Sequence, residues 1–297
     1  MRTRNKIWVG IGAFVVAGTG AVGASGPAPQ SATANTNFSG APLTELLRGT
    51  SIPQSPSHGF VIAQHAKHGG EGGENEGGGK EGPKLPPDLS FALKIAQIRG
   101  HLLVGDQLIK EEQWAAALPH FLHPVEELYG GIRKQLKEFK TPPFEAALKN
   151  LSNIVKRKKG GDDYTKALKA VEDALAAADA GLKDKEKNWQ GFTMETALEL
   201  LKSSTNEYEE AIVKGRIAKP VEYQDARGFV LQSEKMIESV APGLEKKDAE
   251  ALKHVRDALA DLKKTFPTAM PPKTPVKDHG AVLSDVSRIE LAAGRLM

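Results

Sequence analysis

The chain has 297 residues, of which 40% are hydrophobic and 26% are charged, a balance typical of a soluble protein with a buried core. It contains no cysteine, which excludes disulfides, thiolate metal sites and a cysteine nucleophile, so any metal site must use histidine and carboxylate ligands. The formal net charge of +3 falls to zero without residues 1–24, because these carry Arg2, Arg4 and Lys6 and no acidic residue. A neutral remainder lacks the broad positive field that attracts nucleic acid, which we therefore exclude as a partner.

Residues 1–24 have the pattern of a bacterial secretory signal peptide. The basic start is followed by an uncharged stretch from Ile7 to Ala24, and Val22 and Ala24 occupy the −3 and −1 positions of a cleavage site before Ser25. An uncleaved anchor is the alternative, since about 18 apolar residues approach the length that spans a bilayer. We expect cleavage, because the many glycines and alanines weaken a permanent anchor. The sequence thus predicts a periplasmic protein that touches a membrane only through this segment.

Residues 25–86 are rich in Gly, Pro, Ser, Thr and Asn and are predicted to be a disordered linker. Its glycine-rich part carries several histidines and glutamates, for which a solvated flexible spacer is the favoured interpretation. The alternative is a weak metal-collecting tail, in which imidazoles on a mobile backbone converge on an ion. The side chains concerned are His58, His65, His68, Glu71, Glu74 and Glu76.

Apolar residues recur at helical spacing from Leu89 to the end of the chain. No alternating strand and no Asn-Gly hairpin is expected among them, so the predicted fold class is all-α. Asp162 is the expected N-cap of the fourth helix. The stripes predict eight helices, at about residues 89–112, 125–136, 144–155, 162–182, 192–213, 220–240, 252–266 and 278–293.

The eight helices are expected to form two four-helix-bundle units, residues 87–187 and 188–297, joined near residues 184–191. A short echo suggests that the units arose by duplication. Pro124 and Pro220 each begin the run Pro-Val-Glu at a predicted helix start. Proline costs nothing at the first helical position, because its missing N–H would have no partner there.

The stretch LPHFLHPVEELYGG, residues 118–131, concentrates two prolines, two histidines and two glutamates in an otherwise plain helical chain. Pro119 and Pro124 cannot lie in an unbroken helix interior, so the chain must kink or begin a new helix there. A new helix at Pro124 explains Glu126 and Glu127 without any ligand, because carboxylates favour the positive end of a helix. The histidines have no such explanation.

Imidazole nitrogens and carboxylate oxygens at this spacing suit iron, copper or zinc. On a regular helix His120 and His123 would face away from the apolar stripe, so a core-facing site needs the proline kink to turn them inward. Helical bundles build metal sites from inward His and Glu on facing helices, which makes His101 the natural partner from the first helix. The predicted metal ligands are His101, His120, His123, Glu126 and Glu127.

Nothing else in the sequence resembles a catalytic site. It contains no Gly-x-Ser-x-Gly elbow, no phosphate-binding glycine loop and no His-Glu-x-x-His pair, so we expect no enzymatic activity. The second unit offers a group of oxygen-rich side chains, which we interpret as a solvated face. These are Glu207, Tyr208, Glu222, Tyr223 and Asp225.

A secreted, duplicated, all-helical layout with His-x-x-Glu near a kink resembles the imelysin-like periplasmic proteins, over residues 88–297. His123 and Glu126 match the histidine and the glutamate of that motif. The glycine that often precedes it is replaced here by Phe121 and Leu122.

A second resemblance is carried by YEEAIVKGRIAKPVEYQDARGFV, residues 208–230, which is similar to a segment in the periplasmic extension of bacterial iron permeases. The permease's membrane helices and its Arg-Glu-x-x-Glu signature are absent from this sequence, so transport itself is not implied. Both resemblances imply periplasmic handling of iron or a related metal. The residues that match the permease segment are Tyr208, Ala211, Gly215, Glu222, Tyr223, Gln224 and Phe229.

The resulting hypothesis is a non-enzymatic periplasmic protein that binds a metal ion and takes part in iron uptake or handling. Iron is favoured, with copper or zinc as alternatives, and an inner-membrane metal permease is the expected partner. The alternative function is a helical structural or interaction module without a metal site. A metallopeptidase by analogy with imelysin ranks third, because it would need a general base and an open metal position.

Overall fold

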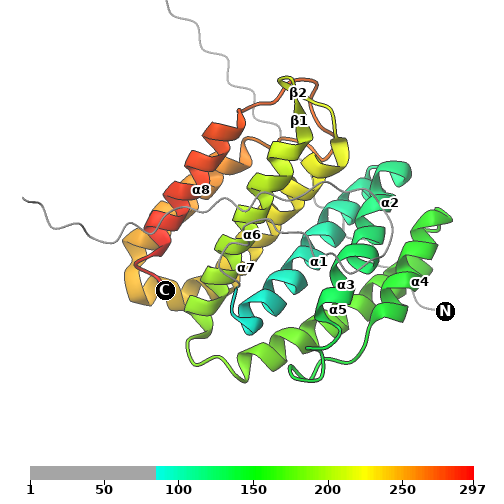
Figure 1. The fold of residues 1–297 in the computed structure, drawn as a ribbon, viewed down its shortest axis with the longest axis horizontal. Coiled ribbons are helices and arrows are strands. Elements are labelled where there is room, and N and C mark those ends of the chain that lie inside the picture. The colour runs from blue at the N-terminus through cyan, green and yellow to red at the C-terminus, as the bar shows by residue number, and fades with distance from the viewer. Residues whose placement is uncertain (1–84) are drawn as a thin grey trace, which may run out of the picture. The chain divides into compact units, whose positions relative to one another are not determined.

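The computed structural model describes residues 85–297, so the predicted signal peptide and linker lie outside the described residues. The described chain is all-α apart from one short hairpin, which confirms the predicted fold class (Figure 1). No helix in this part of the chain combines the length and apolar character needed to cross a bilayer. The elements are α1 (Pro87–Lys110), α2 (Trp114–His123), the π-helix η1 (Pro124–Leu128), α3 (Tyr129–Ile132), α4 (Glu145–Lys156), α5 (Asp162–Lys183), α6 (Trp189–Ala211), β1 (Ile212–Val213), β2 (Arg216–Ile217), α7 (Pro220–Lys263) and α8 (His279–Ala293).

A first hydrophobic core lies among α1, α2, α4 and α5. The rings of Phe91 and Phe139 stack at its centre with their centroids 4.4 Å apart. The hydroxyl of Tyr129 accepts a hydrogen bond from the backbone N–H of Phe144 (3.2 Å), which anchors the irregular stretch before α4. At the start of α5, Gly161 occupies the N-cap. Asp162, the expected N-cap, is instead the first residue of the helix.

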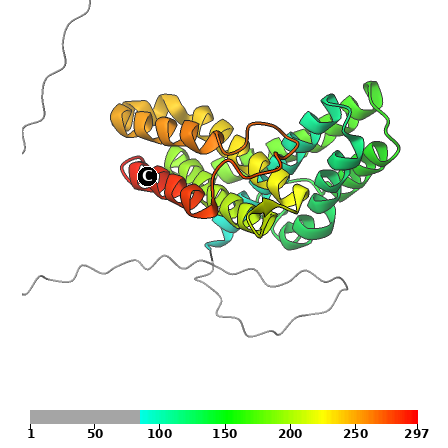
Figure 2. The same ribbon diagram turned by 90° about the horizontal axis from the view of Figure 1, so that it is seen from above.

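A second hydrophobic core lies among α6, α7 and α8. The backbone of α7 leaves the helical region at Asp248 (φ −160°, ψ 94°), and the Asp248 carboxylate accepts from the N–H of Ala251 as a new helix begins. The second segment runs back along the first, because Phe266 packs on Tyr223, near the start of α7, at a centroid distance of 5.4 Å. With α6 and α8, the two segments make four helices, seen from above in Figure 2. The predicted helices at 220–240 and 252–266 therefore correspond to the two parts of α7. The proposed duplication and the domain boundaries stay predictions.

The hairpin of β1 and β2 interrupts the chain where no strand was expected. Ile212 pairs with Ile217 in antiparallel register, and the turn between the strands consists of Lys214 and Gly215 with φ of 52° and 73°. Two positive φ angles in succession suit a two-residue hairpin turn, and glycine adopts them without strain. The predicted helix to Val213 therefore ends two residues early, at Ala211.

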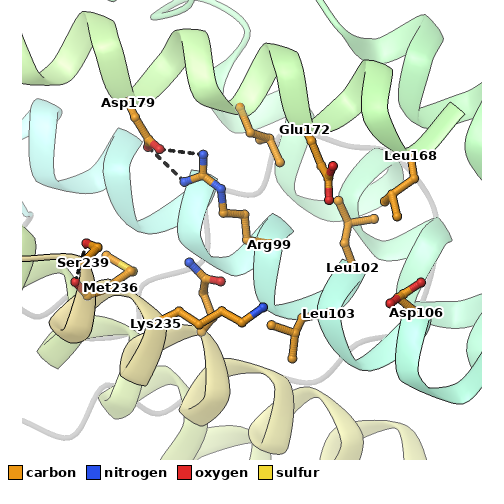
Figure 3. A pocket seen from close by; sticks show the side chains of 12 residues that line it. Arg99, Leu102, Leu103, Asp106, Leu168, Glu172, Asp179, Lys235, Met236 and Ser239 are labelled. Carbon is orange, nitrogen blue, oxygen red and sulfur yellow. Dashed lines mark hydrogen bonds and ion pairs between the residues drawn. The ribbon is translucent and has the colours of Figure 1, made fainter. Parts of the chain in front are cut away.

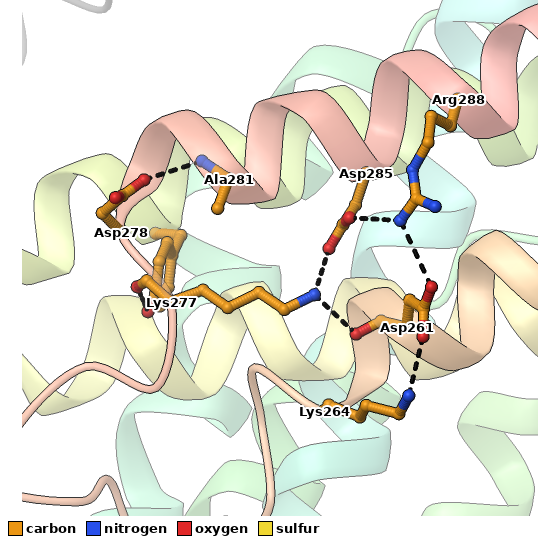
Figure 4. A network of polar contacts seen from close by, with 8 residues as sticks. Asp261, Lys264, Lys277, Asp278, Ala281, Asp285 and Arg288 are labelled. Atoms are coloured by element: carbon orange, nitrogen blue, oxygen red, sulfur yellow. Dashed lines mark hydrogen bonds and ion pairs between the residues drawn. The ribbon is translucent and has the colours of Figure 1, made fainter. Parts of the chain in front are cut away.

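A polar network holds the long connection between α7 and α8 in place (Figure 4). The Lys277 ammonium donates to the Asp285 carboxylate of α8 (2.5 Å) and to the carbonyl oxygen of Asp261 in α7 (2.9 Å). Arg288 donates to the other oxygen of Asp285 (2.6 Å). The hydroxyl of Tyr208 donates to the carbonyl oxygen of Lys277 (2.7 Å), so α6 also helps to fix this connection.

Helix α1 packs against both α2 and α7, and glycines allow both contacts to be close (Figure 1). A β-carbon added to Gly228 of α7 would lie 2.4 Å from the carbonyl oxygen of Gly100 in α1. One added to Gly105 would lie 2.7 Å from the ring of Phe121 in α2. The backbones of α1 and α7 therefore meet almost directly, one residue from His101 on α1 and three from Asp225 on α7.

The close approach predicts the effect of a single methyl group. Gly228→Ala should lower the free energy of unfolding by about 1–3 kcal/mol, because a backbone oxygen cannot move aside as a side chain can. Gly130→Ala is the matched control, since a β-carbon there has no neighbour within 4 Å and alanine favours the helix. Denaturant titration of the two variants measures both effects, and equal stability would contradict the proposed contact.

Candidate metal site

Two prolines and one wide turn interrupt regular helix geometry around His120 and His123. Pro119 lies inside α2, and Pro124 has no N–H for the carbonyl oxygen of His120, which a regular helix would require. The π-helix η1 begins at Pro124, and in it the N–H of Tyr129 donates to the carbonyl oxygen of Pro124, five residues earlier. His120 precedes this turn and lies on the buried face of α2 with Ala117 and Phe121, so none of its surface is exposed, whereas His123 is partly exposed.

Two of the predicted ligands converge on a carboxylate from the second bundle. Nδ1 of His101 lies 2.6 Å from Oδ1 of Asp225, and Nδ1 of His120 lies 2.7 Å from the same oxygen. All three side chains are buried, and their ligand atoms lie within 4.8 Å of one another. Helices α1, α2 and α7 each contribute one residue. The arrangement brings two imidazole nitrogens and a carboxylate oxygen together, the donor set that iron, copper and zinc accept.

The second nitrogen of His120 also has an oxygen partner. Its Nε2 lies 2.9 Å from Oε1 of Gln224, whose amide nitrogen faces the sulfur of Met270 at 3.6 Å. An N–H at Nε2 therefore donates to the amide oxygen. Nδ1, which faces Asp225, then requires either a second N–H or a cation in place of that proton. Gln224 thus leaves the Nδ1 lone pair of a neutral His120 free to bind an ion.

The carboxylate of Asp225 is held in its charged form. Burial alone would raise the pKa of Asp225, but the charges of His101 and His120 and their hydrogen bonds outweigh burial and hold the pKa well below its usual range. A buried carboxylate that stays ionised carries the full negative charge that a metal cation needs. The ionised carboxylate is thus the acceptor that both imidazoles share.

The remaining predicted ligands lie further out. Nδ1 of His123 is 3.4 Å from Oδ2 of Asp225, the oxygen that His101 and His120 do not use. Burial lowers the pKa of His123, but its hydrogen bond to Asp225 and the charges of Asp225, Glu127 and Glu207 more than compensate, so its pKa is raised. Glu127 is exposed but close enough for its charge to act on His123.

Glu126 is exposed, and the geometry does not bring it to the His101–His120–Asp225 group. In η1 a turn takes more residues than in an α-helix, so the His-x-x-Glu spacing does not place Glu126 next to His123 as a regular turn would.

Glu207 of α6 adds a second carboxyl group beside the site. Burial, together with the neighbouring charges of Asp225, Glu210, Glu222 and Glu127, raises its pKa to about 8. Several carboxyl groups therefore crowd together at this end of α6 and α7. Lys219 pairs with Glu210 (3.2 Å) and Glu222 (3.7 Å), which leaves Glu207 without an ion pair among residues 85–297.

The structure also brings Asp225 and Gln224 to the predicted site, although the acidic residues of the second unit were expected to be a solvated face. Asp225 is 2% exposed and Gln224 is 1% exposed. The segment that resembles the iron permease extension contains Gln224 and Asp225, and this was the signal in the sequence. Gln224 and Asp225 follow His120 by 104 and 105 residues in the sequence, so no local pattern predicts that they contact it.

A separate groove lies among α1, α5 and α7 and has a volume of about 410 Å³ (Figure 3). Arg99 of α1 spans it toward α5 and donates to both oxygens of Asp179, at 2.9 and 2.7 Å. Lys235 of α7 lies across the groove from this pair. The groove shares no lining residue with the His101–His120–Asp225 group.

A family described as the iron permease-associated 4-helix bundle domain matches residues 183–297. The match covers α6, α7 and α8 and includes the segment 208–230, whose resemblance to an iron permease extension is thereby confirmed. Comparison with curated proteins and with solved structures gave no match. The resemblance to the imelysin-like proteins stays a prediction. Within the matched region lie Glu207, Gln224 and Asp225, whereas His101, His120 and His123 precede it.

Replacing the central carboxylate should destabilise the fold in a pH-dependent way. Asp225→Asn should lower the free energy of unfolding at neutral pH by about 3 kcal/mol, because it removes the charged acceptor that two buried imidazoles share. The folded pKa of Asp225 lies below the ordinary value of 3.8, so its contribution is present above that pH and is lost as the pH falls through the folded pKa. Denaturant titrations at several pH values measure the difference.

The control for this prediction is Asp173→Asn, which removes an exposed carboxylate paired with Lys169 at 2.7 Å. Such surface pairs contribute about 0–1 kcal/mol, so this variant should behave like wild type. A cost of Asp225→Asn that stays constant from neutral pH to about pH 3 would contradict the ion-pair interpretation.

Proposed function

We propose that this protein takes part in iron uptake as a non-enzymatic metal-binding protein, holding its cargo ion at His101, His120 and Asp225. The observation that carries the proposal is the pair of imidazole Nδ1 atoms on one buried carboxylate oxygen, at 2.6 and 2.7 Å. The iron permease-associated family that matches residues 183–297 supports iron as the cargo and a metal permease as the partner. The signal-like residues 1–24 support a periplasmic location.

The three side chains fit an ion after a small expansion. Ligand atoms bound at about 2.1 Å to one ion lie about 3.0–3.4 Å apart, depending on the coordination geometry. The Nδ1–Oδ1 contacts of 2.6 and 2.7 Å must therefore lengthen by about half an ångström. Rotation of the side chains supplies a shift of this size, and the ion takes the place of the Nδ1 protons. Binding should thus release protons and weaken as the pH falls.

The donor set also limits which ions fit. Two neutral imidazoles and one carboxylate suit ferrous iron, copper(II) and zinc, whereas calcium and magnesium prefer oxygen ligands alone. The absence of cysteine removes the thiolates that would favour copper(I). The family match then favours iron among the remaining ions.

A second candidate function is favoured by the same short contacts. Donor–acceptor distances of 2.6–2.7 Å are those of charge-assisted hydrogen bonds, so the group would also serve as a structural ion pair that locks α1, α2 and α7 together. The protein would then be an interaction module without a metal site. The two functions differ in what the loss of one histidine does to metal affinity.

The deciding experiment measures Fe²⁺ under anaerobic conditions, and Zn²⁺ separately, against a competing chelator in the full chain without an added histidine tag. His120→Ala should weaken the tightest site at least 100-fold. Loss of a residue that only supports a metal ligand costs about 10–100-fold in affinity, so loss of a ligand itself should cost at least the upper value. His254→Ala is the matched control, because His254 is exposed in the second segment of α7. The residues His58, His65 and His68 are present in both variants and contribute equally.

Metal affinity that is the same in wild type, His120→Ala and His254→Ala would overturn the metal-binding proposal. If His120→Ala then also unfolded at lower denaturant concentration than wild type, the structural module would be the correct function. Measuring stability and affinity on the same variants separates the two outcomes.

A further inference from the structure

We propose that the groove among α1, α5 and α7 binds a small zwitterion, a molecule that carries a carboxylate and an ammonium group on a short apolar body. The groove shares no lining residue with the His101–His120–Asp225 group, so this inference does not rest on the metal-binding function. Its volume of about 410 Å³ lies within the range of about 300–1,000 Å³ in which proteins bind small molecules.

Three helices each turn one face toward the groove (Figure 3). The lining residues come from 99–106 in α1, 168–179 in α5 and 232–239 in α7, and in each helix they recur at the three- and four-residue spacing of a single face. All three helices contribute apolar side chains on which the body of a ligand can lie. These are Leu102, Leu103, Leu168, Leu175 and Met236.

Gln232 is a buried polar group in the lining that has no partner. The residue is 6% exposed, and its side-chain amide forms no hydrogen bond with any residue between 85 and 297. An amide offers two N–H donors and an acceptor oxygen, and leaving such a group unpaired in a largely buried place is unfavourable. A ligand carboxylate that accepts from the amide of Gln232 would supply the missing hydrogen bond.

The charges that line the groove leave one of each sign without a partner in the described part of the chain. Arg99 donates to both oxygens of Asp179, and Asp106 pairs with the lysine one turn later in α1, at 2.6 Å. Lys235 and Glu172 form no ion pair with each other or with any other residue of 85–297. A ligand that compensates both must carry a negative and a positive group.

The two unpaired charges come from opposite walls of the groove. In Figure 3, Glu172 projects from α5 and Lys235 from α7, and Leu102 and Leu103 of α1 lie between them. A ligand that meets both charges therefore separates its carboxylate from its ammonium by an apolar chain that lies on these leucines. An ω-amino acid has this arrangement, whereas a molecule with a single charge meets only one wall.

The test uses ε-aminocaproate, with caproate and hexylamine as analogues that lack its ammonium and its carboxylate. Binding to the full chain is followed by NMR of isotope-labelled methionine methyl groups, because Met236 lines the groove whereas Met297 does not. ε-Aminocaproate should shift the Met236 signal and bind at least about 3-fold more tightly than either analogue, since each analogue loses one exposed ion pair. The Met297 signal should not move.

Two variants determine which ligand charge meets which wall. Lys235→Gln should weaken ε-aminocaproate and caproate at least about 3-fold and leave hexylamine unchanged. Glu172→Gln should weaken ε-aminocaproate and hexylamine to the same degree and leave caproate unchanged. Both side chains are exposed, so neither change should unfold the protein. Lys246→Gln is the matched control, because Lys246 is an exposed lysine of α7 outside the groove, and it should leave all three affinities at their wild-type values.

Gln232→Met separates ligand binding from a structural role of the amide. Methionine is about as long as glutamine and has no amide, so the variant should be at least as stable to denaturant as wild type, while its affinity for ε-aminocaproate falls at least about 3-fold. Reduced stability with unchanged affinity would overturn the role of Gln232 as a ligand contact. A Met236 signal that does not move, equal affinity for the three probes, or an equal loss in Lys246→Gln would overturn the zwitterion site.

Discussion

The contact of two imidazoles with one buried carboxylate oxygen is the interaction on which the described structure depends. It joins α1, α2 and α7 at a point where all three side chains are removed from solvent. Burying such charges costs several kcal/mol per ion, and well-packed apolar residues are often as stabilising or more so. Stability alone is therefore a weak reason for His101, His120 and Asp225 to lie here. Their two imidazole nitrogens and one carboxylate oxygen form a donor set that a cation accepts once these contacts lengthen, which supports the proposed metal site.

This contact is possible because the backbones around it come unusually close. Gly100 and Gly228 let α1 approach α7, and Gly105 makes room for Phe121 next to His120. In α2, His120 lies on the same buried face as Ala117 and Phe121, before the wide turn η1 begins. The hydrogen bond from His120 to Gln224 then fixes the ring, and Met270 from the connection before α8 lies behind the amide. Three separate regions of the chain thus contact and orient one imidazole.

The fold could be predicted from the sequence because its signal is local. Each helix carries its own apolar stripe, and the predicted helices at 144–155 and 278–293 differ from α4 and α8 by at most one residue at either end. The hairpin at Lys214 and Gly215 was missed because it has none of the residue pairs usually diagnostic of such a turn. The histidines of the site were predicted for the same local reason: they stand out next to Pro119 and Pro124. Asp225 was not, because its partners lie 105 and 124 residues away and no local pattern distinguishes a buried acid from a solvated one.

The nitrogen and oxygen atoms of the proposed site come from two different parts of the chain. Residues 183–297, which the iron permease-associated family model matches, contribute the oxygen atoms of Asp225 and Gln224. The preceding helices contribute the imidazoles of His101, His120 and His123. A bundle with carboxylates alone would favour hard, oxygen-preferring ions, and imidazoles shift the preference toward ferrous iron, copper and zinc. The packing of α1 and α2 against α7 would thus convert an acidic end of a four-helix bundle into a site with mixed nitrogen and oxygen ligands. Because the nitrogen and oxygen atoms come from different bundles, a small change in how these helices pack would change the separation of the ligands, and with it the affinity for the ion.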